Sequence, residues 1–88
     1  MSRQRTLEKI MSSEYVSIGE LVRITDTRYS TLKFYTEEGM LPFTQEDVGL
    51  TRRYKREDAV KAIDEIKKLR EKGMTIPQIK ELLLQGNR

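Results

Sequence analysis

At 88 residues the chain is expected to form one domain that buries roughly 60–65% of the surface that its unfolded chain exposes. Lysine and arginine exceed aspartate and glutamate by 17 to 14, and the net charge of +3 fits a polyanionic partner and a solvated mixed-charge surface equally well. Cysteine and histidine are absent, which excludes disulfides, thiolate metal sites and histidine general bases, so neither a metal nor a cofactor is expected.

Residues 1–14 are interpreted as an N-terminal extension with few apolar anchors. Leu7, Ile10 and Met11 stand at i, i+3 and i+4, a spacing that fits a short amphipathic helix. A disordered tail fits this polar segment about as well. No apolar run follows the basic start of the chain, and no segment approaches the ~18 apolar residues of a transmembrane helix. We therefore expect a cytoplasmic protein.

Two short helices separated by a polar turn are predicted between residues 17 and 38. Ser17 and Glu20 have the spacing of a capping box at the start of the first helix, which is expected to run to about Ile24. Residues 25–27 are turn and cap residues. The second helix is predicted over residues 28–38.

The two faces of this second helix differ in character. At ~100° per residue, Leu32 and Tyr35 are predicted to face the core, and Tyr29 is a further candidate for that face. The opposite face carries Ser30, Lys33, Phe34 and Glu37. A lysine and an aromatic side chain on the outward face indicate contact with a partner, while packing of Phe34 beneath the following hairpin fits the sequence equally well.

A basic hairpin and two further helices complete the pattern. Gly39 suits the left-handed position that ends a helix, and residues 43–54 are predicted to form two extended pieces around a polar turn at 45–49. The longest helix is predicted over residues 58–72. A second capping box then starts the last helix, whose inward face is expected to carry Ile76, Ile79, Leu82 and Leu83.

Two short helices followed by a basic hairpin are the arrangement by which small proteins place one helix in a DNA groove and a wing on the backbone. The expected fold class is therefore mainly α. Residues 15–86 are expected to form a winged helix-turn-helix domain with about four helices and a small β-hairpin wing. Lys33 can reach a phosphate or a guanine edge, Arg52 lies on the hairpin, and the Tyr54 hydroxyl can bond a phosphate.

Residues 15 to about 84 resemble the N-terminal winged-helix domain of the mercury-resistance regulator (MerR) family. The matching segments are Ile18–Leu21, Thr31–Tyr35, Glu37–Pro42, Arg52–Tyr54, Leu69 with Arg70, Gly73, Ile79 and Glu81–Leu83. The resemblance implies a recognition helix that contacts bases and phosphates, and a wing whose arginine and tyrosine contact the backbone. The DNA-binding residues that we predict are Ser17, Arg28, Tyr29, Ser30, Lys33, Phe34, Arg52, Arg53 and Tyr54.

Some positions depart from the family pattern. Ser30 stands where arginine is common, and Lys33 replaces the usual arginine, which removes bidentate readout of a base. Arg28 stands where a capping serine is usual, so the helix cap is expected to move to Asp26 or Thr27. These changes imply a lower intrinsic affinity or a different operator.

The leading interpretation is a sequence-specific double-stranded DNA-binding transcriptional regulator of the MerR-like type. An excisionase-like architectural or recombination accessory DNA-binding protein shares this scaffold and size, and a helical protein-interaction module is a further alternative. An enzyme is not expected, because the chain has no nucleophile–base pair and no metal cluster. The family's coiled-coil dimerisation helix and effector domain are not encoded after Leu84, so we expect a monomer or weak homo-oligomer that assembles on DNA.

Overall fold

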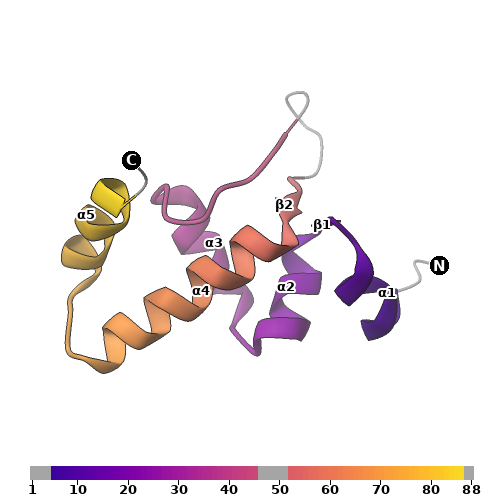
Figure 1. Ribbon diagram of the computed structural model, residues 1–88, viewed down its shortest axis with the longest axis horizontal. Coiled ribbons are helices and arrows are strands. Elements are labelled where there is room, and N and C mark those ends of the chain that lie inside the picture. Colours follow the sequence, from indigo (N-terminus) through magenta and orange to yellow (C-terminus); the bar gives the residue numbers. More distant parts are fainter. Residues whose placement is uncertain (1–4, 46–51, 87–88) are drawn as a thin grey trace.

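The computed structural model describes residues 5–45 and 52–86. Within these ranges the elements are α1 (Leu7–Ser12), β1 (Tyr15–Val16), α2 (Ile18–Thr25), α3 (Tyr29–Glu37), β2 (Tyr54–Lys55), α4 (Arg56–Glu71) and α5 (Ile76–Gly86). Figure 1 shows α4 running along the molecule, with α1 near one end and α5 near the other. The predicted mainly α fold class is confirmed, and α1 adds a helix to the four expected.

The N-terminal segment forms a helix, which was one of the two alternatives that its sequence left open. Thr6 caps α1 by accepting a hydrogen bond from the Lys9 backbone N–H. Of the three predicted anchors only Ile10 is buried, with no exposed surface, whereas Leu7 and Met11 remain about half exposed. Ile10 therefore belongs to the same core as the rest of the chain.

Arg5 ties this segment to α2. Its guanidinium donates to both carboxylate oxygens of Glu20, at 2.6 and 2.7 Å, and to the Ser13 hydroxyl at 2.8 Å. The Arg5 hydrogen bond lowers the pKa of Glu20 to about 2, so the carboxylate stays charged well below neutral pH. Arg23 of α2 returns a hydrogen bond to the Arg5 carbonyl at 2.6 Å. Hydrogen bonds donated by Arg5 and by Arg23 thus fix the segment before α1 against α2.

The small sheet pairs strands that the sequence did not place together. β1 lies antiparallel to β2, with Tyr15 opposite Lys55 and Val16 opposite Tyr54. In the described part of the predicted hairpin, Thr44 and Arg53 form an antiparallel bridge, in which their backbone N–H and C=O groups exchange hydrogen bonds of 2.7 and 2.9 Å. Most of the predicted turn lies outside the described residues.

Helix ends follow the predicted local signals, with one exception. The Ser17–Glu20 capping box is confirmed, and Gly39 has the left-handed φ of 77° that ends the second helix region. The predicted shift of the α3 cap to Asp26 or Thr27 is wrong, because Arg28 occupies the cap position without a side-chain hydrogen bond. Asp26 instead adopts a left-handed conformation at the end of α2.

The core lies where α2, α3 and α4 meet, closed by α1 and the sheet at one side and by α5 at the other. Its fully or almost fully buried side chains are Ile10, Val16, Leu21, Leu32, Tyr35, Met40, Leu41, Tyr54, Ala59, Ile63, Ile66 and Ile79. None of the described helices combines the length and apolar character needed to cross a membrane.

The last two helices match their predictions in all but two details. α4 begins at Arg56, two residues before the predicted start, and its buried side chains are those of Ala59, Ile63 and Ile66. The capping box that starts α5 is confirmed. Leu82 was predicted to face inward, but 41% of its surface is exposed. Of the predicted inward face of α5, only Ile79 is fully buried.

Candidate nucleic-acid interface

One face of α3 is fixed in the core and the other is open. Leu32 and Tyr35 are buried as predicted, which sets the rotation of the helix. The side chains of Ser30, Lys33, Phe34 and Glu37 are all exposed. The exposed fraction of Phe34 is 42%, so of its two alternatives the outward one is observed. A short helix therefore presents a lysine, a serine and an aromatic ring to the solvent.

The start of α3 adds two further exposed side chains. Arg28 is exposed, and Tyr29, which was a candidate both for the core face and for DNA binding, has an exposed fraction of 55%. Tyr29 and Ser17 line the same surface depression of about 450 Å³, which Arg5 and Arg23 also border. Ser17 itself uses its hydroxyl to accept the Glu20 backbone N–H at 3.2 Å, so its first role is to cap α2.

The base of the predicted wing carries two arginines on neighbouring positions. Arg52 is half-buried, and its guanidinium carbon lies 4.8 Å from the centroid of the Phe43 ring. Arg53 is exposed, and its backbone forms the bridge to Thr44. The extended backbone therefore directs these two cations to opposite sides of the wing.

The expectation that the Tyr54 hydroxyl meets a phosphate is wrong in this structure. Only 1% of Tyr54 is exposed, and its hydroxyl lies 2.9 Å from the Thr36 hydroxyl of α3. Because the Thr36 hydroxyl donates to the Leu32 carbonyl at 2.8 Å, the Tyr54 hydroxyl is the donor of the pair. In the sequence Tyr54 lies between the charged residues Arg53 and Lys55, and alternation along extended backbone places it on the opposite face from both, which is the local signal for an inward tyrosine. Tyr54 thus joins β2 to α3.

Replacing Tyr54 by phenylalanine is expected to lower the free energy of unfolding by about 0.5–1.5 kcal/mol, because the variant keeps the ring but removes the donor to Thr36. Urea unfolding of both proteins measures this difference. Tyr15→Phe is the matched control, since the Tyr15 ring is 40% exposed, and its stability should change by less than about 0.5 kcal/mol. Equal losses in the two variants would contradict the buried hydrogen bond.

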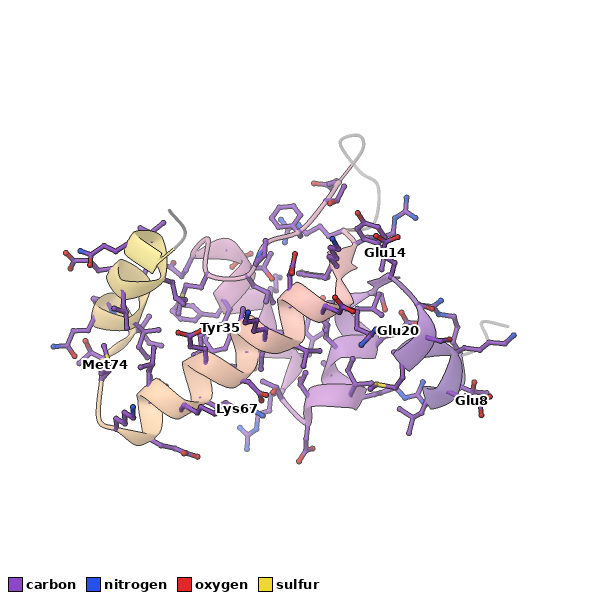
Figure 2. All side chains as sticks on the ribbon, viewed as in Figure 1. Glu8, Glu14, Glu20, Tyr35, Lys67 and Met74 are labelled. Carbon is purple, nitrogen blue, oxygen red and sulfur yellow. The ribbon has the colours of Figure 1, made fainter. Side chains whose placement is uncertain are left out.

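Lys67 is a second supporting residue that the sequence did not reveal. Its ammonium donates to the Thr25 carbonyl at 2.7 Å, so α4 holds the turn between α2 and α3 (Figure 2). On the sequence Lys67 is one of several lysines spaced along α4, and nothing local distinguishes it from its solvent-facing neighbours. The contact joins residues 42 positions apart, which is why only the fold identifies it.

Comparisons with known proteins support one family. The family model described as MerR HTH family regulatory protein matches residues 16–86, which include the whole of α2, α3, the described part of the wing, α4 and α5. No curated protein and no solved structure matches the chain. The matched span contains the helix pair, the bridge at the wing base and the two following helices in the order described above. The chain therefore belongs to the MerR family of helix-turn-helix regulatory proteins.

Proposed function

We propose that the chain binds double-stranded DNA sequence-specifically and acts as a transcriptional regulator, with α3 as its recognition helix. One observation carries the proposal: the core fixes α3 through Leu32 and Tyr35 and leaves Lys33 and Phe34 exposed on the opposite face. Membership of a helix-turn-helix regulatory family supports it. A rigidly held helix with an open face is what a major groove accepts.

The exposed side chains of α3 suit different parts of a groove. The Lys33 ammonium can bond a guanine edge or a phosphate as a single point charge. The Phe34 ring can make an apolar contact with a thymine methyl group. Arg28 stands beside the N-terminus of α3, where unpaired backbone N–H groups favour an anion, so we assign it a phosphate.

The wing supplies contacts that position the protein rather than read the sequence. Arg52 and Arg53 are assigned to the phosphate backbone. Tyr54 is buried and supports the wing from within the core, so no contact with DNA is assigned to it. Tyr29 and Ser17 border the depression at the start of α3 and are assigned to the edge of the interface.

The proposal is tested by selecting bound sequences from a random duplex library and then measuring the affinity for the selected duplex and for a scrambled one. Enrichment of a common motif with tighter binding than to the scrambled duplex is the expected result. Binding to duplexes without enrichment of a motif would indicate general DNA binding and would contradict the recognition of specific sites. No binding to any duplex would overturn the proposal.

Lys33→Ala and Arg52→Ala are expected to affect binding in different ways. Lys33→Ala should weaken binding to the selected duplex roughly fivefold and relax the preference at one or two base positions. Arg52→Ala should weaken binding to selected and scrambled duplexes alike, because phosphate contacts carry no sequence information. Fluorescence anisotropy with both duplexes measures each effect.

The control for these variants is Lys68→Ala, which removes the same charge from an exposed position of α4. Its affinity for both duplexes should stay close to that of the parent chain. A loss confined to the selected duplex in Arg52→Ala would reverse the roles assigned to the helix and the wing.

We further propose that useful occupancy of DNA needs several copies. A single recognition module buries only about 600–1,000 Å² on DNA, so the affinity of one copy for one site is modest. Sedimentation of the chain alone should show mostly monomer, and a duplex with repeated sites should fill cooperatively. A tight dimer in the absence of DNA would contradict this proposal.

A further inference from the structure

We propose that Phe43 is a positioning residue that holds Arg52 for contact with the DNA backbone, an inference that rests on the proposed function. The Phe43 ring lies under the Arg52 guanidinium, with 4.8 Å between the guanidinium carbon and the ring centroid. This distance is well within the range of a cation–π contact. Phe43 is the first residue of the predicted hairpin and belongs to none of the residues assigned to DNA above.

The local backbone explains why these two side chains meet. The bridge between Thr44 and Arg53 brings the two extended pieces together. Side chains alternate along extended backbone, so Phe43 lies on the same face as Arg52 and Tyr54, while Thr44 and Arg53 point to the other face. The Phe43 ring accordingly contacts both neighbours, with 6.3 Å between its centroid and that of Tyr54.

This contact connects Arg52 to the recognition helix. Tyr54 is buried, and its hydroxyl donates to Thr36 of α3. A continuous series of contacts therefore runs from Thr36 through Tyr54 and Phe43 to Arg52. The series fixes where the wing arginine lies relative to the exposed face of α3.

The contact leaves Arg52 able to bind an anion. An arginine stacked on a ring uses the flat face of its guanidinium, whereas its N–H donors point outward in the plane. Within residues 5–45 and 52–86, no carboxylate forms an ion pair with Arg52. A side chain that is already held in place loses less conformational freedom when it binds a phosphate. Phe43 therefore raises affinity without touching DNA.

The test is a double-mutant cycle on duplex DNA of mixed sequence, measured by anisotropy at low salt. Phe43→Leu keeps an apolar side chain but removes the ring, and it should weaken binding about two- to fivefold, the range that corresponds to an exposed cation–π contact. Phe43→Tyr keeps the ring and should bind like the parent chain. In an Arg52→Ala background, Phe43→Leu should cause no further loss.

The outcomes separate this inference from the proposed function. If Phe43→Leu weakens binding by the same factor with and without Arg52, or if Phe43→Tyr binds as weakly as Phe43→Leu, the positioning role is overturned. A general loss of folding would appear in both backgrounds, and thermal unfolding of each variant measures it directly. A parent chain that binds no duplex overturns the proposed function itself, and with it the role of Phe43.

Discussion

Replacing Ile10 by alanine is expected to lower the free energy of unfolding by about 2–5 kcal/mol, although Ile10 lies before the family-matched span. The Ile10 side chain has no exposed surface and belongs to the common core. Its truncation removes apolar contacts and leaves a cavity that a closely packed interior fills only in part. Because small domains have only about 5–15 kcal/mol of stability, this loss would unfold a measurable fraction of the protein at moderate temperature.

Leu7→Ala is the matched control for this prediction. Leu7 lies in the same helix, but 52% of its surface is exposed, so its truncation should cost less than about 0.5 kcal/mol. Urea unfolding followed by circular dichroism compares the two variants. If both lose the same small amount of stability, α1 is a peripheral appendage and not part of the cooperative core.

Raising the salt concentration from 50 to 200 mM is expected to weaken duplex binding about 40-fold. If Arg28, Arg52 and Arg53, the three cations assigned to phosphates, neutralise one phosphate each, the slope of log affinity against log salt is about −2.7. The released counterions carry this dependence, so it should hold for selected and scrambled duplexes alike. Anisotropy titrations across the salt range measure the slope.

Removing one of the three cations should reduce the magnitude of the slope by about one unit. Arg70→Ala is the control, since Arg70 is exposed near the end of α4 and is assigned no phosphate. It should leave the slope of the parent chain unchanged although it removes the same charge. A parent slope near zero would exclude phosphate contacts as the source of affinity, and an equal change in Arg70→Ala would show that net charge alone matters.

The sequence by itself determined the features that depend on residues close together in the chain. The two capping boxes, at Ser17 with Glu20 and at Thr75 with Gln78, form as predicted because each needs only four consecutive residues. The burial of Leu32 and the exposure of Lys33 follow from the 3.6-residue period of the helix. These signals were sufficient for the fold class and for the exposed face of α3.

Only the tertiary structure decided how the wing and the N-terminal segment pack against parts of the chain that are distant in sequence. Tyr54 was expected at the surface, but pairing of β2 with β1 and a hydrogen bond to Thr36 draw it inside. The choice between a helix and a tail for α1 rested on whether Ile10 found a place in the core, which its own segment does not specify. Such contacts join residues far apart in sequence. Their free energy therefore depends on the complete fold, and the local sequence pattern does not indicate them.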